Sequence, residues 1–309
     1  MNFYELKLEN DRLLKVTEFV KFCIDHQGQD IVIQVNNEGH CLRFTGVYDI
    51  LDLFKFNSVT LKTWNIVEHH PTYTIDTTLW NWWLTKLSRV TAAEKWNQQK
   101  IFGCFYGRPS APRLGIATHL AINHKEKSEL TVKFDFKNED SRDLFDIHQL
   151  FVWHPEIVWH LDILKEFINN EEYVRGHYQA QNPLEKLYDN FLIDIVSEPT
   201  NYGNAFYPTE KIVRPLVLQR PFIVMGSKNY LIYLRQLGFK TFHDFWDEDY
   251  DGFDSREKYH RILKLIDHLA TIPKEELNRM YNAMQSILEH NRRLIITQTY
   301  NKNVKRLND

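Results

Sequence analysis

The stretch NAFYPTEKIVRPLVLQRPFIVMG, residues 204–226, places a helix start and an apolar strand close together. Thr209 is a good N-cap, and Glu210 complements the dipole of the helix it begins, each contributing about 0.5–1 kcal/mol. The apolar run 221–225 then predicts a strand, which ends at Gly226. A helix followed at once by such a strand is typical of an α/β unit.

Lys211 is the residue in this stretch that a capped helix alone does not explain. A lysine in the first turn is unfavourable for the helix dipole. A bound diphosphate would account for it, because backbone N–H groups and the ammonium group would share the anion. The adjacent Glu210 carboxylate could accept hydrogen bonds from the two ribose hydroxyls of a nucleotide. Without such a ligand, Thr209 and Glu210 simply cap a helix.

The whole chain alternates between strand-like and helix-like segments, which predicts an α/β fold. Short apolar runs are expected to form strands at 30–35, 59–63, 101–106, 130–134, 191–196 and 221–225. They fall into two successive sets. We therefore expect two Rossmann-like domains facing a cleft, residues 1–97 and 98–309, with the last helix packing back on the first domain. Ligands of such sheets bind at the carboxyl ends of the strands, which singles out the loops 36–40, 64–72, 107–113, 197–210 and 226–230.

Composition narrows the class of protein. Of the 309 residues 43% are hydrophobic and 26% are charged, as in globular proteins, and the net charge of −3 gives no general reason to bind polyanions. The three cysteines form no CxxC pair, which favours a reducing compartment. Neither a signal peptide nor a run of about 18–20 apolar residues is visible in the sequence. These features predict a cytoplasmic protein without a membrane span.

The order Glu198, a polar linker, FYPTEKIVRPL and RPFIVMG resembles the donor-binding domain of GT-B glycosyltransferases, especially the fucosyltransferase type. The likeness covers residues 191–230 and extends more loosely to FGCFYGRPSAPRLGIATHL, residues 102–120. It implies the GT-B fold and transfer of a sugar from a nucleotide-diphosphate-sugar donor to an acceptor hydroxyl. Residues 1–97 would then be the acceptor-side domain and residues 98–309 the domain that binds the nucleotide sugar. The likeness leaves open which sugar and which nucleotide are used.

The resemblance also implies roles for individual residues. Glu210 would hold the ribose and Lys211 the phosphate, and Arg113 would reach the diphosphate from the other side. The full donor-binding set that we predict is Glu210, Lys211, Thr209, Tyr207, Arg113, Arg108 and Glu198. Within it, Arg108 competes with Arg113 for the diphosphate. A helix N-terminus, a lysine and an arginine would stabilise the leaving diphosphate, so we expect neither a metal nor a cofactor.

An inverting transfer needs a base that removes the proton of the acceptor hydroxyl. Glu38 in NNEGH and Glu68 in WNIVEHH each follow a predicted strand of the first half, so they are the candidates for this base. The neighbouring His69 and His70 are weaker candidates. Any one of these residues can equally be an ordinary loop residue.

The segment DEDYDGFDSREK, residues 247–258, matches the first half of a calcium-binding loop at Asp247, Asp249 and Asp251. Its twelfth position, where such a loop has a bidentate glutamate, is Lys258. We therefore interpret the segment as an acidic turn and not as a metal site. His154 and His160 are six residues apart, which does not place them on one helical face, and we expect both to be structural.

The acceptor is expected to be a glycan, and two alternatives stay open. One is a DNA glycosyltransferase of the bacteriophage type that modifies a hydroxylated base. The basic residues of the last segment would then contact phosphates: Arg292, Arg293, Lys302, Lys305 and Arg306. The other alternative is a non-catalytic module that binds a nucleotide sugar or a glycan.

Overall fold

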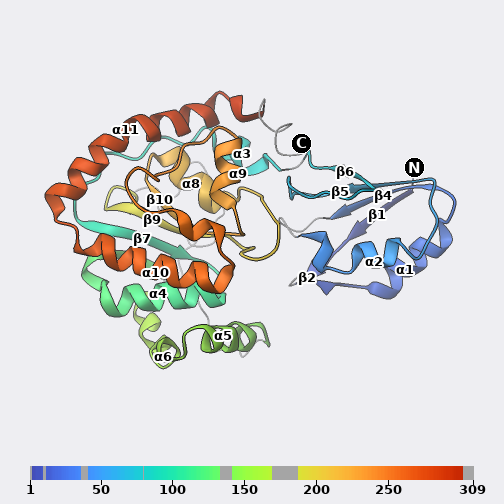
Figure 1. Ribbon diagram of the computed structural model, residues 1–309, viewed down its shortest axis with the longest axis horizontal. Coiled ribbons are helices and arrows are strands. Elements are labelled where there is room, and N and C mark those ends of the chain that lie inside the picture. Colours follow the sequence, from blue (N-terminus) through green and yellow to red (C-terminus); the bar gives the residue numbers. More distant parts are fainter. Residues whose placement is uncertain are drawn as a thin grey trace.

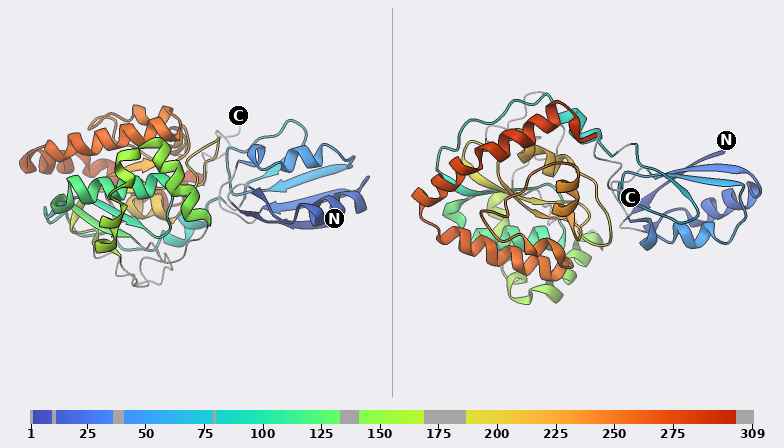
Figure 2. Two further views of the ribbon diagram at one scale, coloured as in Figure 1. Left: turned by 90° about the horizontal axis from the view of Figure 1, so that it is seen from below. Right: turned by 45° about the horizontal axis from the view of Figure 1, so that its top comes forward.

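The computed structural model describes residues 2–9, 12–35, 41–78, 80–132, 141–168 and 187–301. Over these residues the chain is an α/β protein with two four-stranded parallel sheets. The two sheets lie in separate parts of the molecule, and the second part carries most of the helices (Figure 1). Figure 2 shows the same separation from two further sides. The prediction of an α/β class with two successive sets of parallel strands is confirmed.

The first sheet has the strand order β1-β4-β5-β6. Its strands are β1 (Asn2–Leu6), β4 (Asp30–Val35), β5 (Ser58–Lys62) and β6 (Thr74–Asp76). The other elements of this part are the short pair β2 (Leu8–Glu9) and β3 (Arg12–Leu13) and the helices α1 (Val16–Asp25), η1 (Leu42–Phe44) and α2 (Val47–Leu51).

One face of the first sheet builds its core. Alternate residues of β4 and β5, such as Ile31, Ile33 and Leu61, are fully buried against Phe19 of α1. On the other face of the sheet, Phe3 of β1 is 56% exposed. This inside–outside alternation is typical of a sheet covered on one side only. The first half is therefore less enclosed than a doubly wound Rossmann domain.

The second sheet has the strand order β10-β9-β7-β8. Its strands are β7 (Lys100–Tyr106), β8 (Ser128–Val132), β9 (Phe191–Ser197) and β10 (Phe222–Met225). The helices of this part are α3 (Trp82–Leu87), α4 (Ala111–Asn123), η2 (Lys125–Lys127), α5 (Ser141–Trp153), α6 (Pro155–Val158), η3 (Leu161–Phe167), α8 (Glu210–Leu218), α9 (Tyr230–Gln236), η5 (Asp249–Gly252), α10 (Ser255–Thr271) and α11 (Lys274–Ile296).

The order of the second sheet has a functional consequence. From β7 the chain first adds β8 on one side, then crosses to β9 and β10 on the other side. The gap between the carboxyl ends of β7 and β9 is therefore a topological switch point, where open α/β sheets bind their ligands. The residues that follow Tyr106 and Ser197 are the first to inspect for a site.

The segment between the two sheets packs with the second core. Trp80, Leu84 and Trp96 are buried in the same cluster as the strands of the second sheet. The last helix, α11, packs on α8 of this part. Just after α11, the ring of Tyr300 lies 5.6 Å from that of Trp80, and Asn81 donates a hydrogen bond to Asn301. The end of the chain thus reaches back to the connecting segment.

None of the helices that the structure describes combines the length and the apolar composition needed to span a bilayer.

Candidate functional site

Arg113 joins the two loops at the switch point of the second sheet. It lies in the first turn of α4, after β7, and is only 5% exposed. Its Nη2 donates to the carbonyl oxygen of Ser197 at the end of β9 over 2.8 Å, and its Nη1 donates to the carbonyl of Arg108 over 3.2 Å. Arg113, which the sequence predicts to reach a diphosphate, thus lies at the switch point, where its guanidinium group holds the two loops together. The side chain of Arg108 is exposed to solvent.

Glu198, the residue after β9, is the centre of a buried polar cluster. It is 2% exposed, and its Oε1 accepts a 2.8 Å hydrogen bond from the Tyr230 hydroxyl. Its Oε2 accepts a hydrogen bond from the hydroxyl of Thr209. Thr209 is in turn the N-cap of α8 and accepts a hydrogen bond from the backbone N–H of Lys211. Glu198 therefore fixes the start of α8 against the ends of β9 and β10.

A small cavity of about 10 Å³ lies within this cluster. Its lining residues come from the segment between β9 and α8 and from α9: Glu198, Pro199, Thr200, Ala205, Tyr207, Thr209 and Tyr230. The volume suits about one water molecule and no larger ligand. This space is part of the buried support of the first turn of α8 and is too small for a nucleotide.

Burial raises the pKa of the Glu198 carboxyl group to about 7, against the opposing effects of Lys211, Thr209 and Tyr230. The ordinary pKa is 4.5, so the folded state binds the proton more tightly than the unfolded state. The protonated Glu198 carboxyl group therefore contributes to the free energy of unfolding. This contribution is fully present below about pH 4.5 and is lost as the pH rises through about 7. A difference of this size corresponds to about 3 kcal/mol.

We therefore expect Glu198→Gln to flatten the pH dependence of the free energy of unfolding between about pH 4.5 and pH 7. The measurement is urea unfolding of both proteins across this range, with the difference between them taken at each pH so that other titrating groups cancel. A wild-type-minus-variant difference that stays constant with pH would show that Glu198 does not titrate there.

Glu210 and Lys211 form a close pair in the first turn of α8. The Lys211 ammonium lies 2.5 Å from Oε1 of Glu210, and the two side chains are 23% and 14% exposed. Burial acts to raise the pKa of Glu210, but Lys211 and then Arg214 outweigh it, so this pKa lies below its usual value. The carboxylate is therefore charged. Its Oε2 is buried, and no group in the described part of the chain donates to it.

Asn65 connects the two sheets. Its side chain donates to the carbonyl of Asn204 over 3.1 Å and accepts from the N–H of Phe206 over 2.8 Å. The N–H of Ile66 also donates to the Phe206 carbonyl over 3.1 Å. The loop after β5 therefore lies against the segment that leads into α8. The two halves of the predicted site meet here.

Glu68, one of the two predicted bases, lies just beyond this junction and is 6% exposed. Its Oε1 accepts a 2.8 Å hydrogen bond from the Tyr48 hydroxyl, and its Oε2 accepts from the N–H of Leu42 and from Asn65, both over 3.0 Å. Burial raises the pKa of Glu68, against the effect of these donors. The carboxyl group thus also holds η1 and α2 to the loop after β5. Glu38, the other candidate, lies outside the described residues.

A larger cavity, of about 550 Å³, opens at the junction. Both halves line it: Phe44 from η1, and Asn201, Tyr202, Gly203, Asn204, Lys228, Asn229, Tyr233, Asp254 and Ser255 from the second half. Its size falls in the range of about 300–1,000 Å³ that is usual for small-molecule sites. Aromatic rings with amide and charged groups at the rim suit a sugar or a nucleobase.

The structure brings most of the predicted donor residues to one edge of the second sheet. Glu198, Thr209 and Tyr207 line one small cavity, Glu210 and Lys211 follow directly, and Arg113 reaches the end of β9. Sequence reasoning missed Arg214, which lies one turn after Glu210 and acts on its charge. The i, i+4 spacing on a helix that begins at Thr209 was the signal for it.

The acidic turn contains no open calcium loop. Asp251 is 3% exposed, and its Oδ1 lies 3.2 Å from the Lys258 ammonium. Its Oδ2 accepts from the backbone N–H of Leu231 at the start of α9 over 2.8 Å. Lys258, fully buried, also donates to the carbonyls of Gly226 and Ser227. The pair therefore holds the loop after β10, which sequence reasoning did not foresee.

The remaining predicted residues have no place in this cluster. His154 contacts the Tyr259 hydroxyl over 3.0 Å, in keeping with a structural role, and His160 is exposed. Arg292 of the basic segment donates to the Val217 carbonyl. Three of the basic residues lie outside the described part of the chain: Lys302, Lys305 and Arg306.

Comparisons with known proteins do not assign a family to the chain. No family model matches the chain, and no curated protein matches it.

Proposed function

We propose that the protein is a glycosyltransferase that binds a nucleotide-diphosphate sugar at the N-terminus of α8. The observation that carries the proposal is the Glu210–Lys211 pair at the positive end of a helix. It is a charged carboxylate beside an ammonium group, and one buried carboxylate oxygen accepts no hydrogen bond from the described residues. A ribose hydroxyl would satisfy the carboxylate, and a diphosphate would take the ammonium and the helix N-terminus. The resemblance to fucosyltransferase-type donor domains supports the same assignment.

The buried cluster behind the pair supports this proposal. Glu198 and Tyr230 fix Thr209, and Thr209 fixes the first turn of α8. Arg113 fixes the facing loop through the Ser197 carbonyl. A preorganised site of this kind stabilises charge that develops on a leaving diphosphate without having to rearrange. The cavity at the junction would hold the part of the donor or acceptor beyond the diphosphate.

In the reaction that we propose, the acceptor hydroxyl oxygen attacks the anomeric carbon as the bond from that carbon to the diphosphate breaks. The proton of the hydroxyl passes to a carboxylate of the first half. The diphosphate leaves as an anion held by Lys211 and the start of α8. A single displacement of this kind inverts the anomeric configuration. We propose a glycan as the acceptor and Glu68 as the base, because of its burial and its place beside the junction.

Glu68→Gln is expected to lower the rate of transfer by about 10²–10⁴-fold, because it removes the proton acceptor. Donor affinity should stay unchanged, because we propose that Glu68 contacts the acceptor and not the donor. Initial rates and calorimetric donor titration of the same preparation separate the two effects. Since Glu68 also holds η1 and α2, thermal unfolding must show that the variant is folded. If the variant transfers the sugar at the wild-type rate, Glu68 is not the base. Glu38→Gln is then the next variant to measure.

A second candidate is a non-catalytic module that binds a nucleotide sugar. The observation that favours it is the engagement of Glu68, since both of its carboxylate oxygens already accept hydrogen bonds. Such a module would bind the donor through Glu210 and Lys211 and would neither transfer nor hydrolyse the sugar. Donor binding without release of nucleoside diphosphate, in the presence of glycan acceptors, would select this candidate.

A further inference from the structure

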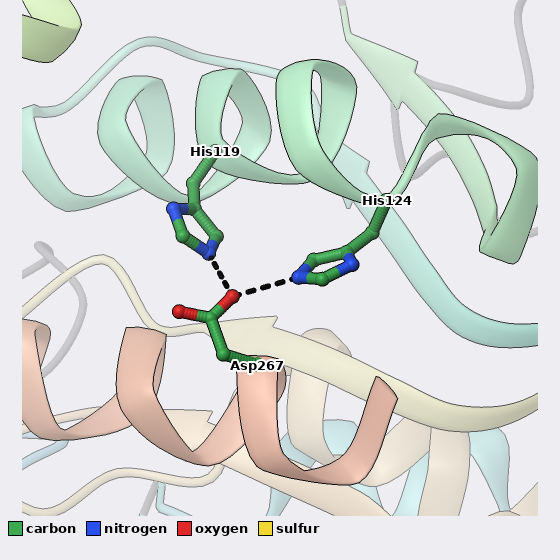
Figure 3. A group of neighbouring side chains, drawn as sticks. All are labelled: His119, His124 and Asp267. Atoms are coloured by element: carbon green, nitrogen blue, oxygen red, sulfur yellow. Dashed lines mark hydrogen bonds and ion pairs between the residues drawn. The ribbon is translucent and has the colours of Figure 1, made fainter. Parts of the chain in front are cut away.

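We propose that His119, His124 and Asp267 form a binding site for a divalent cation of the zinc type. His119 lies on α4, His124 follows its last residue, and Asp267 lies on α10 (Figure 3). The site is distinct from the proposed reaction centre. Arg113 is at the opposite end of α4, and His124 follows it by 11 positions, which correspond to about 16 Å along a helix.

Three donor atoms from the two helices converge on one point. Nε2 of His119 and Nε2 of His124 each lie 2.7 Å from the same oxygen, Oδ1 of Asp267. Figure 3 shows both rings turned toward this oxygen. All three donor atoms lie within 4.8 Å of one another. Two imidazoles and one carboxylate are a donor set typical of zinc, whereas magnesium and calcium prefer oxygen ligands throughout.

The protonation of the cluster suits a cation. Burial lowers the pKa of His119, although Asp267 opposes this effect, so the imidazole is neutral at neutral pH. Burial acts to raise the pKa of Asp267, but the hydrogen bonds from His124 and His119 outweigh it, and the pKa lies below its usual value. The cation would therefore meet one carboxylate and neutral imidazole, the forms that bind metals.

Asn123 would support the metal-bound form. Its amide nitrogen, Nδ2, lies 3.2 Å from Nδ1 of His119. When Nε2 binds a cation, the imidazole proton moves to Nδ1, and a half-turn of the Asn123 amide group would bring its carbonyl oxygen to Nδ1 as the acceptor. A partner of this kind on the second ring nitrogen is the usual support of a metal-binding histidine.

The cluster is open on one side. The side chains of His119 and His124 are 10% and 12% exposed, whereas that of Asp267 is 51% exposed. The exposed side gives a cation a way in and leaves room for a water molecule as fourth ligand. Ligands of a tetrahedral zinc ion lie roughly 3.3 Å apart, given metal–ligand distances of about 2.0–2.1 Å. To admit the ion, the carboxylate oxygen would have to withdraw from each imidazole nitrogen by about 0.6 Å, from 2.7 Å to roughly 3.3 Å. The two imidazole nitrogens, which lie within 4.8 Å of one another, would have to take up the same spacing.

The test is a titration of the full chain, first freed of metal with a chelator, with Zn²⁺ in a calorimeter and with Co²⁺ in a spectrophotometer. We expect about one equivalent of Zn²⁺ to bind, a visible absorption band of tetrahedral Co²⁺ to appear, and the melting temperature to rise by a few degrees with Zn²⁺. Mg²⁺ and Ca²⁺ should give none of these effects.

Asp267→Asn and His124→Ala should each weaken Zn²⁺ binding by at least about tenfold. The matched control is His268→Ala, which removes an exposed histidine next to Asp267 and should bind Zn²⁺ like the wild type. Absence of Zn²⁺ binding to the folded wild type would overturn the proposal and leave a metal-free hydrogen-bonded cluster. Equal binding by all three variants would overturn it as well, because the ion would then lie elsewhere.

Discussion

Lys211→Ala is expected to weaken binding of a nucleoside diphosphate by about 10- to 100-fold, since a charge-assisted hydrogen bond contributes about 1.5–3 kcal/mol. The variant removes the ammonium group at the start of α8 and leaves the Thr209 cap in place. Calorimetric titration with nucleoside diphosphates measures the change. The fold should persist, because the Lys211 side chain is partly exposed and its one described ion pair is with its neighbour Glu210.

The matched control for this prediction is Lys240→Ala, which removes an exposed lysine from another loop of the same half. It should bind the nucleotide as tightly as the wild type. If Lys211→Ala and the wild type bind the nucleoside diphosphate with equal affinity, Lys211 does not take part in donor binding. Glu210→Gln then shows whether the neighbouring carboxylate contributes to nucleotide binding, because we propose that it accepts hydrogen bonds from the ribose hydroxyls.

Asp251→Ala is expected to lower the free energy of unfolding by about 3–5 kcal/mol, because it leaves the fully buried Lys258 without its anionic partner. It also removes the acceptor for the N–H of Leu231 at the start of α9. Urea unfolding monitored by tryptophan fluorescence gives the difference directly. The loss should be accompanied by weaker nucleotide binding, since the Asp251–Lys258 pair holds the loop after β10 that lines the junction cavity.

Asp249→Ala provides the control for this effect, because Asp249 is an exposed carboxylate two residues away. It should change the stability by less than about 0.5 kcal/mol. Combining Asp251→Ala with Lys258→Met removes both charges and should recover part of the stability. A double variant that is less stable than either single variant would contradict the view that an uncompensated buried charge causes the loss.

The strands of the second half could be predicted because they are short runs of apolar residues that are buried on both faces. The expected strand at 191–196 appears as Phe191–Ser197, with every residue buried. The sequence pattern failed at the edges of the first sheet. Phe3 and Glu5 of β1 are exposed and Tyr4 is half-buried, so the strand has no apolar run, and β6 has only three residues. Such edge strands form because they pair with a neighbouring strand, and the local sequence pattern does not show this pairing.

The candidate site could be located in part from the sequence, because the carboxyl ends of parallel strands meet at one edge of the sheet. This rule pointed to the loops that carry Glu198, Thr209 and Arg113, and the structure brings these residues together at the end of β9. It did not indicate that Arg113 would donate to backbone carbonyls, nor that Glu68 would bind three groups of the first half. Those bonds depend on how loops far apart in sequence pack together. The His119–Asp267 contact escaped notice for the same reason, since 148 residues separate its partners.

The most direct test of the central claim is a screen of the purified chain against nucleotide-diphosphate sugars, with glycan acceptors present and absent and release of nucleoside diphosphate as the readout. The account predicts that one donor class is consumed, that an acceptor increases its consumption, and that Lys211→Ala strongly lowers it. Tight donor binding without release would select the binding module. DNA-dependent release, with the strong salt dependence of DNA contacts, would identify a DNA acceptor. Neither binding nor consumption of any donor by the folded wild type would contradict the account.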